Sequence, residues 1–175
     1  MTSKKIFIHL VIDKFNIITF VLSQISNAWF NKYCSIKIFF MYRNKTKLRV
    51  RYGETDKMGY VYHGNYAQYF EIGREEAMRN LGSDYAALEK NGILMPVISL
   101  WTKFFAPAYY DQVLTVETVI NTFPNIRMKF DYNIYNASEV LVASGQTTLV
   151  FVDEAKRKPV KPPEWFLDLL RPYFK

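Results

Sequence analysis

An aspartate and a histidine lie close together in a glycine-interrupted segment that leads into a helical pattern. The segment reads Arg51-Tyr-Gly-Glu-Thr-Asp-Lys-Met-Gly-Tyr-Val-Tyr-His-Gly-Asn65. A carboxylate can serve as a nucleophile or general base toward a carbonyl carbon, and an imidazole can transfer protons near neutral pH. The N-terminus of the following helix would add unpaired N–H groups and the positive end of a dipole. Asp56 and His63 are therefore our first candidate catalytic residues, acting on a polarised carbonyl group.

Each candidate also has a purely structural explanation. An aspartate before a turn often only accepts hydrogen bonds from nearby backbone N–H groups, and a single histidine often only caps a turn. Tyr52, just upstream of Asp56, is a third candidate, although it could equally be a packing residue. The remaining tyrosines of the segment are expected to form walls and core: Tyr60, Tyr62, Tyr66 and Tyr69.

Several other classes of site are excluded by residue content. The chain has one cysteine, Cys34, and two widely separated histidines, His9 and His63, so no zinc site with the usual Cys and His ligands is expected. There is no G-x-S-x-G elbow and no phosphate-binding P-loop, and Gly59 with Gly64 does not make a dinucleotide-binding fingerprint. We expect no metal. The single cysteine also fits a reducing compartment, and we expect a cytoplasmic location.

Residues 1–40 differ from the rest of the 175-residue chain. They contain five lysines and one aspartate, so more than half of the net charge of +7 lies there, and the remainder is not basic enough to indicate a nucleic-acid partner. Three interpretations stay open: translation starts at Met41, or the region is an amphipathic extension, or it is an export or membrane segment. The uncharged stretch Phe15–Asn31 is short and polar for a membrane span.

Downstream of this region the pattern predicts a strand, a loop and a long helix. Residues 47–52 alternate polar and apolar as a half-buried strand would, and 53–64 form a loop. Asn65 is a plausible helix N-cap, and Gly82 is a candidate C-terminal glycine. The helix between them has apolar residues at helical spacing: Tyr66, Phe70, Gly73, Ala77 and Leu81. Its apolar, aromatic start indicates that it is covered on several sides.

The second half of the chain predicts mostly strands. A short helix over 83–91 is followed by four strand-like runs, at 96–105, 113–122, 126–135 and 140–152, and by a last helix over 164–170. This order predicts an α+β fold in which one antiparallel sheet of about five strands wraps around one long central helix. Such a sheet has two exposed edges, so pairing with another copy of the chain is expected.

Residues 51–66 resemble the active-site block of hotdog-fold acyl-CoA thioesterases, in the 4-hydroxybenzoyl-CoA thioesterase-like and YbgC-like branch. The resemblance continues through Glu71–Glu75, Gly92–Val97 and Phe105–Asp111 and covers roughly residues 44–170. It implies a hotdog thioesterase domain over 41–175, while residues 1–40 have no counterpart in the family. That mismatch favours Met41 as the true start.

The resemblance also implies site residues. Asp56 matches the catalytic carboxylate of the family, and Tyr52 and His63 match positions in the same site. We place Asn65 and Tyr66 among the substrate-binding residues. The family polarises the thioester carbonyl with a backbone N–H, which the sequence does not assign here. Tyr60 stands where the family usually has a smaller aliphatic residue, which would reshape the pocket.

The expected reaction is hydrolysis of an acyl-CoA thioester to a free acid and coenzyme A, with Asp56 as nucleophile or general base. No cofactor is expected, because coenzyme A is part of the substrate. An aromatic acyl-CoA of the 1,4-dihydroxy-2-naphthoyl-CoA type is one option. A non-catalytic module that binds acyl thioesters or acyl carrier protein is the alternative from another class, and a hotdog dehydratase ranks last. We expect a homodimer or homotetramer without membrane association. Candidate phosphate-binding residues are Lys103, Arg127 and Lys129.

Overall fold

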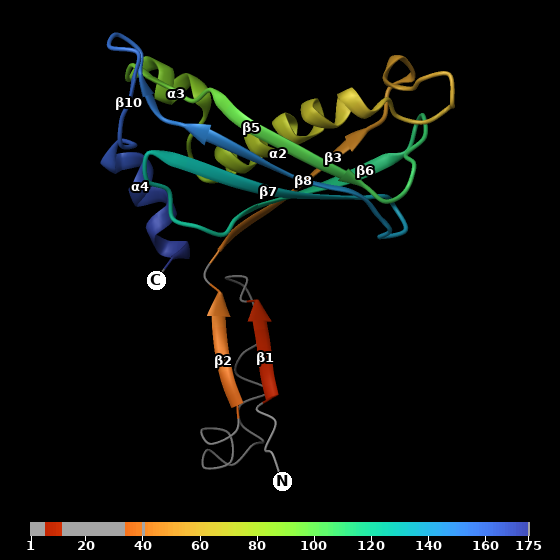
Figure 1. Ribbon diagram of the computed structural model, residues 1–175, viewed down its shortest axis with the longest axis horizontal. Coiled ribbons are helices and arrows are strands. Elements are labelled where there is room, and N and C mark those ends of the chain that lie inside the picture. Colours follow the sequence, from red (N-terminus) through yellow and green to blue (C-terminus); the bar gives the residue numbers. More distant parts are fainter. Residues whose placement is uncertain (1–5, 12–33, 40, 175) are drawn as a thin grey trace. The chain divides into compact units, whose positions relative to one another are not determined.

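The computed structural model describes residues 6–11, 34–39 and 41–174, and the chain divides into two compact units, Met1–Met41 and Tyr42–Lys175 (Figure 1). In the first unit, strands β1 (Ile6–Val11) and β2 (Cys34–Phe39) pair in parallel. The uncharged stretch Phe15–Asn31 lies outside the described residues. The three interpretations of residues 1–40 therefore stay predictions.

Within residues 41–174, five strands form one antiparallel sheet with the order β3-β6-β7-β8-β5. The long helix α2 (Tyr66–Asn80) lies across one face of this sheet (Figure 1). The strands are β3 (Tyr42–Arg49), β5 (Val97–Phe104), β6 (Val113–Ile120), β7 (Arg127–Tyr135) and β8 (Leu141–Val150). The predicted α+β architecture, an antiparallel sheet around one long helix, is confirmed.

Smaller elements complete the second unit. The short strands β4 (Ile93–Leu94), β9 (Val152–Asp153) and β10 (Lys158–Pro159) form a separate sheet. Helices α3 (Tyr85–Lys90) and α4 (Glu164–Leu170) lie where helices were predicted, and three 3-10 turns are present: η2 (Tyr52–Glu54), η3 (His63–Asn65) and η4 (Arg171–Tyr173). The described helices are all too short or too polar to span a lipid bilayer.

The first strand of the sheet differs from its prediction. It begins at Tyr42 and ends at Arg49, whereas the alternation predicted residues 47–52. After Arg49 the backbone leaves the ladder, because Val50 donates to the carbonyl of Gln112 and accepts from the N–H of Asp111. Tyr52 therefore does not end the strand and instead begins the turn η2.

The prediction of Asn65 as a helix cap is also wrong in its chemistry. Asn65 occupies the position before α2, but its backbone is already helical and its side chain caps no N–H group of the helix. The amide Nδ2 instead donates to the backbone carbonyl of Glu54 at 2.7 Å. The preceding 3-10 turn supplies the helical start, so a side-chain cap is not needed.

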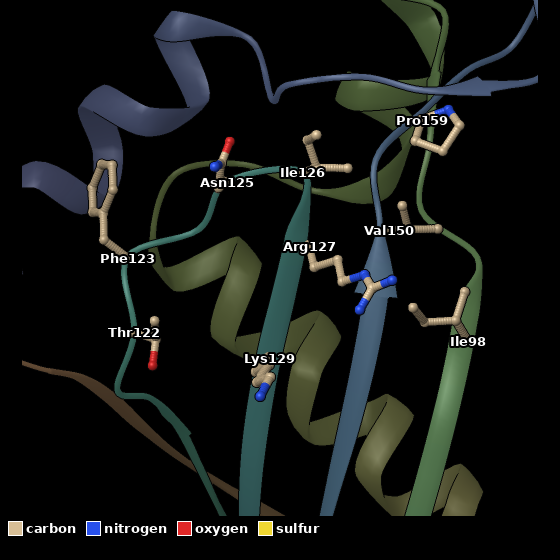
Figure 2. A pocket seen from close by; sticks show the side chains of 9 residues that line it. All are labelled: Ile98, Thr122, Phe123, Asn125, Ile126, Arg127, Lys129, Val150 and Pro159. Carbon is tan, nitrogen blue, oxygen red and sulfur yellow. The ribbon is translucent and has the colours of Figure 1, made fainter.

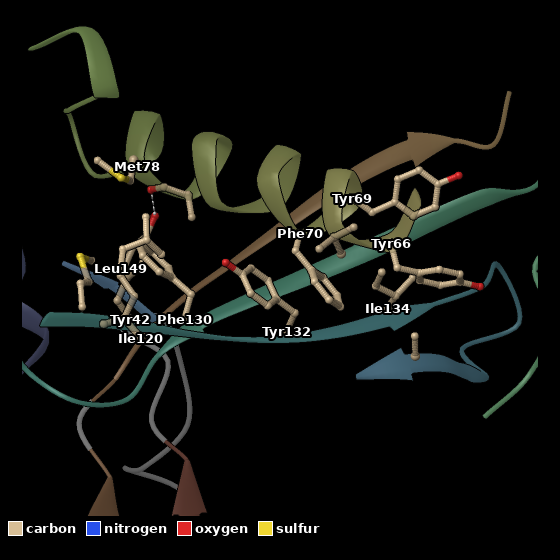
Figure 3. Packing of buried hydrophobic residues seen from close by; sticks show 14 of the residues in the cluster. Tyr42, Tyr66, Tyr69, Phe70, Met78, Ile120, Phe130, Tyr132, Ile134 and Leu149 are labelled. Carbon is tan, nitrogen blue, oxygen red and sulfur yellow. Dashed lines mark hydrogen bonds between the residues drawn. The ribbon is translucent and has the colours of Figure 1, made fainter. Parts of the chain in front are cut away.

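The core lies between α2 and the sheet (Figure 3). The strand predicted over 126–135 is present as β7, and its residues Met128, Phe130, Tyr132 and Ile134 are all buried on the helix side. Phe70 of α2 stacks on Tyr132 with ring centroids 4.5 Å apart. Such stacked aromatic pairs contribute about 0.5–1.5 kcal/mol beyond the apolar area they bury. This packing holds α2 in register above the strands.

The edge strand β5 has apolar side chains that the other residues of 42–174 leave exposed. Val97, Ile98, Leu100, Trp101 and Phe104 each remain 46–52% exposed. A long apolar edge strand presents unpaired backbone groups and apolar surface, and proteins normally cover such an edge. β5 is therefore a surface where further protein could pack.

Candidate active site

A tight turn between the first strand and α2 presents Asp56. Thr55 and Val61 form an isolated antiparallel bridge, and the N–H of Asp56 donates to the carbonyl of Tyr60 at 3.0 Å. The N–H of Gly59 closes the tip by donating to the carbonyl of Asp56 at 2.9 Å. Gly59 has a φ of +82°, which residues with a Cβ rarely adopt, so the glycine is needed for this turn. We name residues 55–61 the Asp56 hairpin.

The carboxylate of Asp56 is half-buried and uses one oxygen within the turn. Its Oδ1 accepts a hydrogen bond from the N–H of Met58 at 2.8 Å. Among the described residues, no donor reaches Oδ2. The purely structural explanation for Asp56 is therefore present, but it occupies only half of the carboxylate, and the second oxygen is open to a ligand.

His63 begins the 3-10 turn that leads into α2, and its side chain is exposed. Its imidazole lies against the ring of Tyr62, with the two centroids 4.3 Å apart. The N–H groups of Val61, Tyr62, Asn65 and Tyr66 donate to backbone carbonyls. Within the described chain, the N–H groups of His63 and Gly64 have no such acceptor, as expected for the first residues of a helical segment.

Asp56 and His63 line the same surface hollow, which has a volume of about 450 Å³. The rest of its lining is mainly apolar and aromatic: Met58, Tyr60, Val61, Tyr66, Phe104, Phe105, Ala106 and Pro107. The hollow thus combines an acid and an imidazole with apolar walls. Such a combination suits an apolar ligand that carries one polar reactive group.

Two tyrosines shape the walls of this hollow. Tyr66 is buried and packs edge-on against Phe104, with centroids 4.9 Å apart, and burial raises its pKa to about 12. Tyr66 therefore stays a neutral wall residue at physiological pH. The hydroxyl of Tyr60 donates to the sulfur of Met58 at 2.9 Å, which fixes the Tyr60 ring across the Asp56 hairpin.

Two predicted site residues lie outside the hollow. Tyr52 is 78% exposed and packs edge-on against Tyr110, with centroids 5.5 Å apart. Asn65 uses its side chain to hold the carbonyl of Glu54. The structure thus brings together Asp56, His63 and Tyr66 but not Tyr52 or Asn65, and the site roles of these last two residues stay predictions.

Sequence reasoning missed one buried acid, Glu54. Its carboxylate accepts from the N–H and the guanidinium of Arg51 and from the hydroxyl of Tyr69. Burial on its own would raise the pKa of the Glu54 carboxyl, but the hydrogen bonds from Arg51 and Tyr69 outweigh burial and leave the pKa below its ordinary value. The spacing of Arg51 and Glu54, a basic and an acidic residue three positions apart around a turn, is the sequence signal that could have indicated this contact.

A metal site finds no support in the described part of the chain. No three of its His, Cys, Asp and Glu residues lie close enough together to hold a metal ion.

Comparison with known proteins gives the same family from sequence and from structure. The family model described as the thioesterase-like superfamily matches residues 50–170. The protein YneP of Bacillus subtilis is 34% identical over 128 residues, which cover 73% of this chain and 93% of that protein. The acyl-CoA thioester hydrolase YbgC of Escherichia coli is 31% identical over 117 residues, 67% of this chain and 87% of its own length.

A solved structure agrees with both sequence matches. The DHNA-CoA thioesterase of Staphylococcus aureus superposes with a TM-score of 0.70 at 35% identity, and the match covers 75% of this chain and 88% of that one. The family match over residues 50–170 includes the Asp56 hairpin, α2 and the strands β5 to β8, and it begins directly after β3.

Proposed function

Because the chain belongs to the thioesterase-like superfamily, we propose that it hydrolyses acyl-CoA thioesters to a free carboxylic acid and coenzyme A. One observation of the structure supports this activity most directly: Asp56 and His63 line one apolar hollow at the entrance of α2. A non-catalytic binding module on the same fold would not need a carboxylate with an open oxygen beside an imidazole. The thioesterase is therefore favoured over the binding module.

In the proposed reaction the thioester carbonyl points at the start of α2. The N–H groups of His63 and Gly64 donate to the carbonyl oxygen and stabilise the negative charge that develops on it. Preorganised donors of this kind commonly contribute a factor of about 10²–10³ to the rate.

Asp56 then acts in one of two ways. As a general base it removes a proton from water, the hydroxide adds to the carbonyl carbon, the C–S bond breaks, and the thiolate of coenzyme A takes up a proton. As a nucleophile its Oδ2 attacks the carbonyl carbon and displaces the thiolate, and water then hydrolyses the acyl anhydride. His63 orients the water or supports the oxyanion in either route. Both routes use only residues of the chain and water, and we propose that no cofactor takes part.

We propose an aromatic acyl group for the substrate. The hollow is walled by Tyr60, Tyr66, Phe104 and Phe105, whose rings can pack against a planar acyl group. Tyr60 adds a large ring to this wall where the family usually has a smaller aliphatic residue. The similar structure from Staphylococcus aureus is a DHNA-CoA thioesterase, which supports the same substrate class.

We further propose that two copies of the chain pair through β5. Antiparallel pairing of two β5 strands would cover the exposed apolar side chains of each. It would also set the Ile98 end of one copy beside the Phe104 end of the other, where the second copy's Asp56 hollow lies. The site would then be shared between the two copies. A dimer fits this arrangement, and so does a tetramer made of two such dimers.

This pairing gives Arg127 and Lys129 a role. They line a second hollow of about 620 Å³ at the Ile98 end of β5, and Figure 2 shows Arg127 extending from β7 across β8 toward Val150 and Ile98. In the proposed pair their positive charges would lie near the second copy's Asp56 hollow and could bind the phosphates of coenzyme A. Lys103 lies instead over the ring of Phe105, 5.3 Å from its centroid, beside the Asp56 hollow of its own copy.

An acyl carrier protein is an alternative carrier of the acyl group, because it presents the same thioester. We infer a cytoplasmic location, which a chain with one cysteine fits.

The test is a hydrolysis assay on the full chain and its Asp56→Asn variant. Both proteins are given short, long and aromatic acyl-CoAs, and release of free thiol is followed. We expect hydrolysis that is fastest on aromatic substrates and falls by about 10²–10⁴-fold in the variant. Equal rates would reject Asp56 as the catalytic residue. No hydrolysis of any substrate, with acyl-CoA binding detected by calorimetry, would favour the binding module.

A further inference from the structure

We propose that Glu54 is a positioning residue: its buried carboxylate holds the Asp56 hairpin and His63 in place against α2. The proposal rests on the thioesterase function above. Glu54 does not line the hollow, so any effect on catalysis must act through the residues that it holds.

The carboxylate of Glu54 joins two separate elements. Its Oε2 accepts from the N–H of Arg51 and from the hydroxyl of Tyr69 on α2, both at 2.8 Å. Its Oε1 accepts from Nε of Arg51 at 2.7 Å. The turn η2 is thus tied to the first turns of α2 by a residue that is 7% exposed. Hydrogen bonds to an ionised acceptor are about twice as strong as neutral ones, so this connection is a firm one.

The backbone carbonyl of the same residue holds the other side of the site. It accepts from the N–H of Tyr62 at 2.9 Å and from the side-chain amide of Asn65 at 2.7 Å. The first of these bonds closes the base of the Asp56 hairpin, since Glu54 and Tyr62 immediately flank residues 55–61. His63 follows Tyr62 directly. Asp56 and His63 therefore emerge from opposite sides of a base that Glu54 fixes.

Glu117 is the other buried acid among residues 42–174, and it makes no comparable contacts with the site. Glu117 lies on the outer face of the sheet, where it pairs with Arg43 and Lys45 and accepts from Asn133. These contacts join neighbouring strands and reach no residue of the site. Glu54, in contrast, binds Tyr69 of α2 through its carboxylate, and through its carbonyl it binds Tyr62 and Asn65, which flank His63 and Gly64.

The consequence for catalysis follows from geometry. A displacement of about 1 Å of a catalytic group can lower the rate about 10²-fold. A glutamine amide offers one neutral acceptor oxygen in place of the two charged oxygens that bind Arg51 and Tyr69. The anchoring of η2 is therefore weakened, and the hairpin base can shift relative to the N–H groups of His63 and Gly64. The acyl-CoA can still enter the hollow, so the loss should appear in kcat and not in KM.

The experiment compares the full chain with Glu54→Gln, Tyr69→Phe and the double variant in the hydrolysis assay. We expect Glu54→Gln to lower kcat by about 10–100-fold with KM within about threefold, and Tyr69→Phe to lower it less. The double variant should be no worse than Glu54→Gln, because both changes break one connection. The matched control is Glu89→Gln, at an exposed position of α3, which should keep the kcat of the unchanged chain.

Amide hydrogen exchange supplies a readout that needs no activity. In Glu54→Gln the N–H groups of Asp56 and Tyr62 should lose protection by about tenfold or more, while those of β7 keep theirs. Unchanged protection at Asp56 and Tyr62 would overturn the proposal, and so would an unchanged kcat in an active enzyme. Uniform loss of protection, including β7, would also overturn it, because Glu54 would then only stabilise the fold. If the unchanged chain hydrolyses nothing, the proposed function fails by itself, and the exchange data still decide whether Glu54 positions the hairpin.

Discussion

The Oδ1 oxygen of Asp56 accepts a hydrogen bond from the backbone N–H of Met58 at 2.8 Å. This bond orients the carboxylate without using Oδ2. Oδ1 therefore stabilises the turn, while Oδ2 stays available for the proposed reaction. An asparagine can keep the first function, because its carbonyl oxygen accepts the same bond, and it loses the second, because an amide is neither a base nor a nucleophile at neutral pH. Folding and catalysis can therefore be separated at this position.

We predict that Asp56→Asn leaves the free energy of unfolding within about 0.5 kcal/mol of the unchanged chain, whereas Asp56→Ala lowers it by about 1 kcal/mol through loss of the turn hydrogen bond. Both variants should be catalytically impaired. Urea unfolding followed by circular dichroism measures the first quantity. If Asp56→Asn were as destabilised as Asp56→Ala, the turn would depend on the charge of the carboxylate. Folding and catalysis could then not be separated at Asp56.

The pH dependence of stability should reveal the carboxylate of Glu54. Its pKa in the folded chain lies below the ordinary value of 4.5: burial opposes this, but the bonds from Arg51 and Tyr69 prevail. A carboxyl with a lowered folded-state pKa stabilises the fold fully above its unfolded pKa, and this contribution disappears as the pH falls through the folded value. The stability difference between the unchanged chain and Glu54→Gln should therefore be constant from pH 7 to about 5 and shrink below 4.5.

Urea unfolding at pH 7, 5, 4 and 3 would measure this difference. The same series on Glu89→Gln, in which an exposed acid is removed, gives the background from other carboxylates. A difference that grows on acidification would contradict a lowered pKa for Glu54.

The fold was largely predictable because its strands are periodic. In β7 each inward residue packs on α2 or its neighbours and each outward one faces solvent, so the period of two is undisturbed. The first strand was misplaced because its burial pattern is weak: Tyr42 is its only buried residue, and the others are half-buried or exposed. Its end at Arg49 depends on the loop around Asp111, which has a φ of +66° and pairs through its backbone with Val50. Such a long-range pairing leaves no local signal.

The site was predictable where its residues are close in sequence. Asp56 and His63 lie on the two sides of one hairpin, so their shared hollow follows from a short segment. Glu54 was missed because its significance depends on Tyr69, which lies on a different element and reads in the sequence as a core tyrosine. Tyr52 is near Asp56 in sequence, but the turn η2 directs its ring toward Tyr110 and away from the hollow, so its role in the site stays a prediction.

A glycine of β8 tests how closely α2 approaches the sheet. A Cβ at Gly145 would lie 2.5 Å from two ring atoms of Phe70 and 2.7 Å from the backbone carbonyl oxygen of Trp101. That carbonyl belongs to β5, which pairs with β8, so it cannot move without disturbing the ladder. We predict that Gly145→Ala lowers the free energy of unfolding by about 1–3 kcal/mol. Gly53→Ala, where no atom lies within 4 Å of the added carbon, is the matched control, and equal urea midpoints for the two variants would contradict the close approach.

The uncovered edge of β5 leads to a prediction about self-association. Trp101 is 52% exposed at the middle of this edge strand, so in antiparallel pairing of two β5 strands the two copies of this residue lie near each other. Trp101→Glu would remove apolar contact area and place like charges across the pair, which is unfavourable between neighbouring strands. We expect the full chain to sediment as a dimer or tetramer and the variant to dissociate at least tenfold more readily.

Lys47→Glu changes a residue of β3, the opposite edge strand, and should leave association intact. Dissociation by Lys47→Glu alone would instead place the interface at β3, and the shared site proposed above would lose its basis, because β5 would no longer bring Arg127 of one copy near Asp56 of the other.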